Sequence, residues 1–289
     1  MAESFYKSLD IGKDVANTRT LLHEAIPLTG TIVSGTYGTA NIKNYAHGMF
    51  QSVYDYPYLS SSANHIFDIT AGVSAESSLY ASVTTAGQKS KKLNIYNQMA
   101  QVLVGFDHTG SVQRFDEDGD ILAGGTKLDN IFFMNFARLL SKDEIKKGTF
   151  NLELGVTPAY SQAGAVFGDR IKIEDTSGSN GYLVNSPVGE YGILYATRSA
   201  GSNAMLAANQ SYAVGLLFYQ AGIAVTSGSI FNQASAGGIL NNSFHNVSMS
   251  GPSSTSEPLN AVLTGSTIDT LADNLRTRMY NLQFNNTVE

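Results

Sequence analysis

The residues with the clearest potential for chemistry are the acids of one short turn. Asp116, Asp118 and Asp120 surround Gly119. Oxygen-rich turns bind hard cations such as Ca²⁺ when carboxylates alternate with backbone carbonyls. A calcium loop of the helix-loop-helix type needs Gly at its sixth position and Glu at its twelfth. Here Gly119 is fourth and Lys127 is twelfth, so we predict a solvated acidic turn without a metal and keep the three aspartates as candidate ligands.

The other nucleophilic and metal-binding patterns are incomplete. Residues 4–7 match S-x-x-K but lack the accompanying lactamase motifs, and residues 34–38 are a turn without the P-loop lysine. His65 and Asp68 are close enough in sequence to meet, yet no nucleophile is indicated beside them. No metal-binding spacing occurs among the five histidines, which are His23, His47, His65, His108 and His245.

The sequence also gives no sign of acid–base catalysis by paired carboxylates or of thiol chemistry. A glycosidase needs two carboxylates placed across a cleft, and the sequence pairs none of its acids. The acids considered for that role are Glu76, Asp107, Asp116, Glu144 and Glu153. The chain has no cysteine, which excludes disulfides and zinc–thiolate sites. We predict that the protein is not an enzyme, has no catalytic residue and uses no cofactor.

The composition points to a protein that works by contact. Of 289 residues, 43% are hydrophobic and only 15% are charged, against about 25% charged in typical soluble domains. Protein interfaces are depleted of charge and enriched in tyrosine, and the chain has 15 tyrosines. The net charge of −6 and the scattered basic residues argue against nucleic-acid binding. We see no apolar signal-peptide core and no membrane-spanning run, so we expect neither such export nor membrane insertion.

Two amphipathic helices are expected from apolar residues at three- and four-residue spacing. The first covers residues 91–105, with Leu93, Tyr96, Met99 or Ala100, and Leu103 on one face, and it ends at Gly105. The second covers residues 267–282 with Thr267 as its N-cap. Its apolar stripe packs either on its own domain or on another subunit, and its residues are interface candidates: Ile268, Leu271, Leu275, Met279 and Leu282.

Most of the remaining regular structure is expected to be β. Strands are predicted at residues 65–70, 149–156, 165–173, 189–197, 212–219 and 222–231, with a hairpin turn at residues 220–222. Residues 71–90 are predicted to be a loop. The type of residues 130–140 stays open, and residues 141–144 match a helix-start pattern for a short helix at residues 143–147. The fold class is therefore mainly β (α+β), a β-sandwich or small barrel with peripheral amphipathic helices and long polar arms.

Four regions follow from these patterns. Residues 1–64 form an N-terminal strand or arm region, and residues 65–231 form the main β-rich domain. Residues 232–266 are dense in Ser, Asn and Gly and read as a flexible arm or linker. Residues 267–289 form the C-terminal helix and tail. No internal repeat is found, which argues against a fibre shaft.

Several long phrases of this sequence resemble virion structural proteins of T4-like contractile-tailed bacteriophages. The resemblance covers roughly residues 65–230 and carries no catalytic motif. Its blocks are residues 65–73 (HIFDITAGV), 91–108, 114–121 (RFDEDGDI), 132–156, 191–197 and 215–226.

The resemblance implies a building block of the phage particle, found in the virion tail after assembly in the host cytoplasm. A baseplate component is the first expectation, whose partners are copies of itself and other tail or baseplate proteins. A neck or fibre-attachment protein is an alternative, as is a peripheral glycan- or receptor-binding module. Tyr54, Tyr56 and Tyr58 would serve such contacts if they lie on one side of an extended strand.

Overall fold

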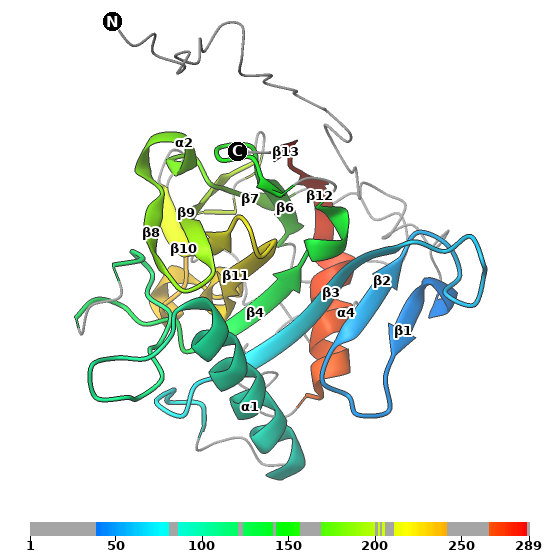
Figure 1. Cartoon of the computed structure of the whole chain (residues 1–289), viewed down its shortest axis with the longest axis horizontal. Helices are drawn as coiled ribbons and strands as arrows, with labels where there is room; N and C mark the ends of the chain where they lie inside the picture. Colours follow the sequence, from blue (N-terminus) through cyan, green and yellow to red (C-terminus); the bar gives the residue numbers. More distant parts are fainter. Residues whose placement is uncertain are drawn as a thin grey trace, which may run out of the picture.

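The computed structural model describes residues 39–80, 86–120, 124–140, 143–156, 169–199, 202, 204–205, 211–241 and 266–287. Its main feature is one antiparallel sheet of eleven strands, accompanied by a two-stranded sheet (Figure 1). The mainly β prediction is confirmed. The edge strands β1 and β12 do not pair with each other, so the large sheet is open and is not a closed barrel.

Within the large sheet, hydrogen-bonded neighbours follow the order β1-β2-β3-β4-β11-β10-β9-β7-β6-β12. Strand β8 pairs with β9 outside this order. Their bounds are β1 Ile42–Asn44, β2 Gln51–Tyr54, β3 His65–Val73, β4 Asn130–Asn135, β5 Glu144–Ile145, β6 Asn151–Gly155, β7 Arg170–Glu174, β8 Leu183–Ser186, β9 Gly189–Arg198, β10 Tyr212–Phe218, β11 Ile223–Ser227, β12 Met279–Gln283 and β13 Asn286–Thr287. The helices are α1 Ala86–Leu103, α2 Gly178–Gly181 and α4 Ile268–Arg278, with short 3₁₀ turns at Thr39–Asn41, Ala137–Leu139, Gly228–Phe231 and Ala234–Ala236.

Strand β4 resolves the open assignment of residues 130–140. Ile131 and Phe133 join the core cluster around α1, whereas Phe132 and Met134 join the larger cluster that includes α4. A strand buried on both faces has no polar face and therefore reads as a continuous apolar run. The outer strands β6 and β7 face the core with one side only, and their side chains alternate between buried and half-buried.

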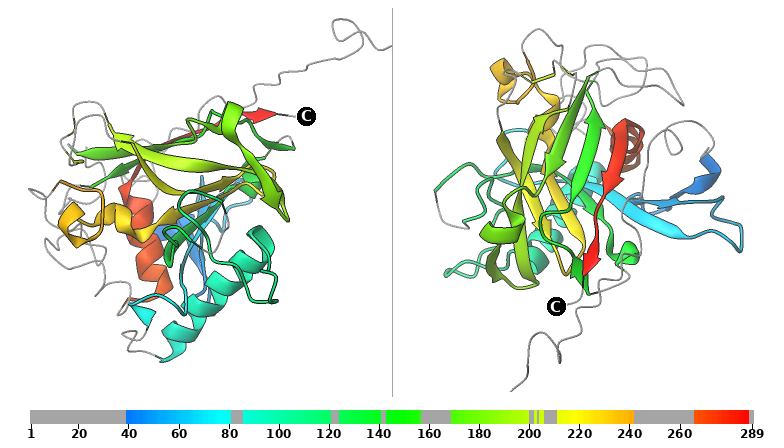
Figure 2. Two further views of the ribbon diagram at one scale, coloured as in Figure 1. Left: turned by 90° about the vertical axis from the view of Figure 1, so that its left-hand side faces the viewer. Right: turned by 90° about the horizontal axis from the view of Figure 1, so that it is seen from above.

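The large core cluster shows how the sheet curves. It contains Val53 of β2 and Ile173 of β7, strands from distant positions in the sheet, together with Leu271 and Leu275 of α4. Both ends of the sheet thus contribute to one core. Both long helices pack on β3 (Figures 1 and 2). Strands from three of the four regions proposed from the sequence hydrogen-bond into this one sheet.

Helix α1 is confirmed with the expected stripe, because Tyr96, Ala100 and Leu103 are buried. It begins at Ala86, inside the segment predicted to be a loop, whose first residues extend β3 to Val73. The sequence did not reveal Lys92, which is fully buried; its Nζ donates to the carbonyl of Ser266 at 2.8 Å. Burial lowers the pKa of Lys92 to about 8.

The second helix is shorter than predicted. Thr267 caps α4 as expected, accepting a hydrogen bond from the backbone N–H of Thr270 at 3.2 Å. The helix ends at Arg278, and Met279 and Leu282 belong to β12, which pairs with β6. An irregularity between Met279 and Asn281 shifts the register. It places both apolar residues in the core despite their three-residue spacing, which had imitated a helix.

The short helix predicted at residues 143–147 is wrong. Glu144–Ile145 is strand β5, which pairs with β13 near the C-terminus, and the backbone N–H of Ile145 donates to the carbonyl of Tyr219 at 3.1 Å. Long-range pairing therefore overrides the local helix-start pattern. The predicted turn at residues 220–222 is confirmed, since it joins the antiparallel strands β10 and β11.

Candidate functional site

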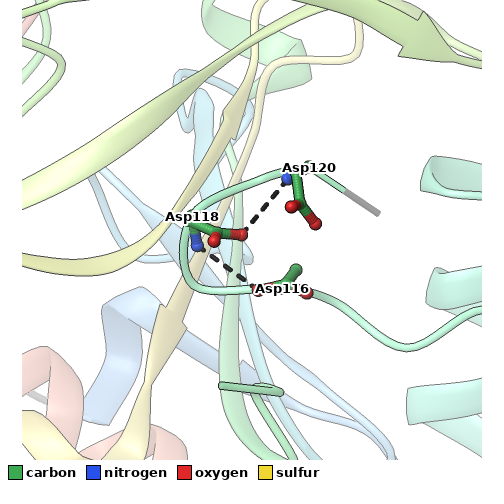
Figure 3. Close-up of side chains that lie close together, drawn as sticks. All are labelled: Asp116, Asp118 and Asp120. Carbon is green, nitrogen blue, oxygen red and sulfur yellow. Dashed lines mark hydrogen bonds between the residues drawn. The ribbon is translucent and has the colours of Figure 1, made fainter. Parts of the chain in front are cut away.

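The acidic turn is closed by hydrogen bonds along its own chain. Asp116 accepts from the backbone N–H of Asp118 at 3.4 Å, and Asp118 accepts from that of Asp120 at 3.3 Å (Figure 3). Each aspartate has a carboxylate oxygen within 4.8 Å of those of the other two. Asp116 is buried and pairs with the ammonium group of Lys127, so a lysine already supplies positive charge at the one buried carboxylate. Burial raises the pKa of Asp116, and Lys127 opposes that rise.

A serine, an aspartate and a histidine meet on neighbouring strands. Asp68 Oδ1 lies 2.7 Å from His65 Nε2 and accepts a 2.5 Å hydrogen bond from Ser52 Oγ. In a hydrolase triad the imidazole lies between the hydroxyl and the carboxylate and takes the hydroxyl proton. Here the Asp68 carboxylate lies between the other two side chains. These hydrogen bonds therefore join His65 and Ser52 each to Asp68 and not to each other. The arrangement links β2 to β3 through side chains and does not have the order of a hydrolase triad.

The five acids considered for glycosidase chemistry lie on separate elements. Glu76 is exposed in a turn, and Asp107 accepts from the backbone N–H groups of Thr109 and Ser111. Glu144 pairs with Lys147, and Glu153 pairs with Arg170. Asp116 belongs to the acidic turn. The motif-like residues 4–7 and 34–38, together with His23 and His245, lie outside the described residues.

A buried ionic network lies where the segments before β6, after β7 and after β10 meet β5 and the start of β9. The carboxylate of Asp175 accepts from the backbone N–H groups of Gly148 at 2.6 Å and Phe150 at 3.0 Å, and from the Tyr219 hydroxyl at 3.1 Å. Nearby, Lys147 Nζ lies 3.0 Å from Glu144 and 2.5 Å from Glu190. Burial raises the pKa of Asp175 to about 6 despite its three hydrogen bonds. This network joins elements of the core.

The interface candidates of the C-terminal segment are part of the chain's own core. All five have no exposed surface; they are Ile268, Leu271, Leu275, Met279 and Leu282. In this conformation they pack within the core clusters of their own chain.

Tyr54, Tyr56 and Tyr58 do not lie on the single extended strand that was expected. Strand β2 ends at Tyr54, and the chain then turns. The rings of Tyr54 and Tyr58 come together, with centroids 6.2 Å apart. Tyr56 is 58% exposed and the following Leu59 is 86% exposed. We call residues 55–64, which join β2 to β3, the hairpin tip. It projects at the margin of the described part of the molecule (Figures 1 and 2).

An apolar groove lies between α1, the loop before β2, and the strands β3 and β4. Its volume is about 520 Å³, and its apolar lining comes from Met49, Phe50, Ile95, Met99, Val102 and Phe133. Val102, on α1, is 56% exposed at this groove. The sequence showed the buried stripe of α1 but not that a neighbouring face of the same helix stays open.

A polar cavity of about 430 Å³ lies where several central strands begin or end. Asn130 at the start of β4, Tyr212 at the start of β10 and Ser227 at the end of β11 line it, as do Glu117 and Asn232 from loops. Sequence reasoning missed this cavity. Its residues come from distant segments, and no local motif marks them.

Comparisons with protein-family models, with curated proteins and with solved structures find no match for this chain. None of the helices in the described part of the chain is long and apolar enough to cross a bilayer. Fold and surface thus define a mainly β protein with an open, curved sheet. Its particular role is a matter for proposal.

Proposed function

We propose that this protein is a structural building block of a bacteriophage virion and acts through contacts between subunits. The tail baseplate is the first position to test, with the neck or a fibre attachment as the alternative. The resemblance of residues 65–230 to virion proteins of T4-like phages motivates the phage assignment. The low share of charged residues fits a surface that becomes buried on assembly.

The observation that carries the proposal is the exposed hairpin tip. A single exposed leucine is ordinary, but clustered apolar side chains on a projecting element mark an interaction site. Tyr56, Tyr58 and Leu59 follow one another closely along this tip, and all three are exposed in the described part of the chain. The same chain also carries the apolar groove. A protruding apolar element and a hollow elsewhere on one chain are what head-to-tail assembly into rings requires.

The test is the native mass of the purified chain, alone and mixed with the other tail proteins of its particle. We expect a ring-sized oligomer or a stable mixed complex. Leu59→Ser at the tip and Val102→Asp at the groove should each weaken association by about tenfold or more, since each removes or charges a central apolar contact. Gln101→Asp is the matched control, because Gln101 is an exposed neighbour of Val102 outside the groove lining.

Two results would count against the proposal. One is a monomer at all concentrations that joins no tail protein. The other is an oligomer that neither Leu59→Ser nor Val102→Asp affects, which would remove the tip and the groove from the assembly surface.

A further inference from the structure

The polar cavity contains side chains whose hydrogen-bonding capacity is not used by the described part of the chain. Asn130 accepts through Oδ1 from the Ser77 hydroxyl at 2.8 Å. Its NH₂ group donates to no described residue, and neither the Asn232 side-chain amide nor the Glu117 carboxylate has a partner among the described residues. A carboxylate only accepts, an amide nitrogen only donates and an amide oxygen only accepts. The cavity therefore offers both kinds of group to a ligand.

The charged residues at the cavity are largely neutralised within the protein. Lys127 pairs with Asp116, and Arg114 Nη1 contacts both carboxylate oxygens of Asp129 at 3.1 and 3.2 Å. The remaining charge is that of Glu117, whose pKa is raised by burial and by the neighbouring Asp116 and Asp118. An anionic ligand would meet the Glu117 carboxylate and be repelled.

The lining also disfavours apolar and extended peptide ligands. Serines, a threonine, asparagines and glycines form the larger part of the wall, beside the apolar Leu79, Leu128, Ala213 and Ile239. The cavity lies at strand ends, so it does not present the open strand edge along which an extended peptide adds as a further strand. A compact, uncharged ligand with many hydroxyl groups matches these features, because each hydroxyl both donates and accepts.

We propose that this cavity is a saccharide-binding site, in which the Glu117 carboxylate accepts hydrogen bonds from sugar hydroxyls while Asn130 and Asn232 bind neighbouring oxygens. Tyr212 supplies an aromatic surface at the same wall. The site lies apart from the hairpin tip and shares no lining residue with the apolar groove. Saccharide binding and subunit association can consequently be measured separately.

The experiment titrates the full chain with maltose, lactose and N,N′-diacetylchitobiose, followed by saturation-transfer NMR and calorimetry. We expect at least one of the three to bind, and Glu117→Gln and Asn232→Ala each to weaken that binding by about tenfold or more through loss of a hydrogen bond. Glu76→Gln is the control: it makes the same chemical change on an exposed residue of the turn before the cavity, and Glu76 does not line it.

Melting temperatures close to that of the unchanged chain would show that both variants fold. Absence of binding by all three disaccharides at millimolar concentration would overturn the proposal. So would binding that survives both substitutions unchanged, because the sugar would then occupy another place. A chain that binds sugar but stays monomeric and joins no tail protein would refute the assembly proposal alone.

Discussion

At the scale of single residues, burial decides what each ionisable group can do. Asp175 is 1% exposed, and its ionised form is held by two backbone N–H groups and the Tyr219 hydroxyl. These bonds oppose the effect of burial without cancelling it, so the pKa is about 6 rather than the ordinary 3.8. Glu144, Glu190 and Lys147 lie in the same network. The pKa of Tyr219 is raised mainly by burial and by Asp175, and further by the two glutamates.

A pH dependence of stability follows from Asp175. A folded-state pKa above the unfolded value means that the folded state holds the proton more tightly. The contribution of Asp175 to the free energy of unfolding is therefore largest below about pH 4, falls by about 3 kcal/mol as the pH rises to about 6, and is constant above that. Tyr219→Phe removes a donor to the carboxylate and should move this transition to higher pH.

The measurement for this prediction is the carboxyl ¹³C shift of Asp175 against pH, together with urea unfolding between pH 4 and 8. Tyr56→Phe is the control, because Tyr56 is exposed on the hairpin tip far from the network. An unchanged titration in Tyr219→Phe would show that the hydroxyl does not stabilise the carboxylate.

At the scale of elements, the tightest constraint found is the strand pair β10–β11. A Cβ atom at Gly215 would lie 1.9 Å from the carbonyl oxygen of Val225, a backbone atom that cannot move without disturbing the ladder. The pairing of β10 with β9 shifts register between Ala213 and Gly215. Glycine is required here by the close approach of two backbones.

Gly215→Ala should lower the free energy of unfolding by at least about 2 kcal/mol, as overpacking does in a rigid core. Gly87→Ala is the opposite case, because a Cβ at Gly87 of α1 meets nothing within 4 Å. There alanine should stabilise by about 0.5–1 kcal/mol. Urea unfolding of both variants gives the comparison. Equal stability of Gly215→Ala and the unchanged chain would contradict the close approach.

Secondary structure was predictable where its signal is local. The stripe of α1, the cap at Thr267 and the turn at residues 220–222 depend on spacing and on turn chemistry within a few residues. The errors at residues 143–147 and 279–282 share one cause. In both, the backbone pairs with a strand far away in sequence, β13 in one case and β6 in the other.

At the scale of the whole molecule, the C-terminal segment completes the core. Strand β12 pairs with β6 at the end of the large sheet, and Arg278, fully buried, donates from Nη1 to the carbonyl of Gly155 at 3.2 Å. Removing residues 232–289 would otherwise be an attractive way to separate an assembly arm from a binding domain. In this fold it would also remove part of the core.

A chain ending at residue 265 should therefore fail to fold, because β6 loses its partner and the surface under α4 is opened to water. A chain ending at residue 287 should keep the native far-UV circular dichroism and a cooperative unfolding transition. Native spectra from the shorter chain would show that α4 and β12 are dispensable, and would restore the simple arm hypothesis.

The candidate sites also divide into those that a local sequence pattern predicts and those that long-range strand pairing creates. The acidic turn was predictable, because its three aspartates are within five residues of one another. His65 and Asp68 could be expected to lie within reach of each other, since they are three positions apart, but the structure was needed to show their contact. It could not place Ser52 on the same carboxylate, nor bring Glu117, Asn130 and Asn232 to one cavity. Those encounters depend on which strands become neighbours.

The sequence by itself determined that this protein is mainly β, poor in charge, free of thiol chemistry and equipped with two amphipathic helices. These properties follow from composition and from periodicities that repeat within a few residues. Only the tertiary structure decided that β4 is buried on both faces, that the C-terminal stripe belongs to the core, and that an apolar tip, a groove and a polar cavity remain on the surface. Burial and exposure are settled by long-range pairing, which brings together residues that no local pattern connects.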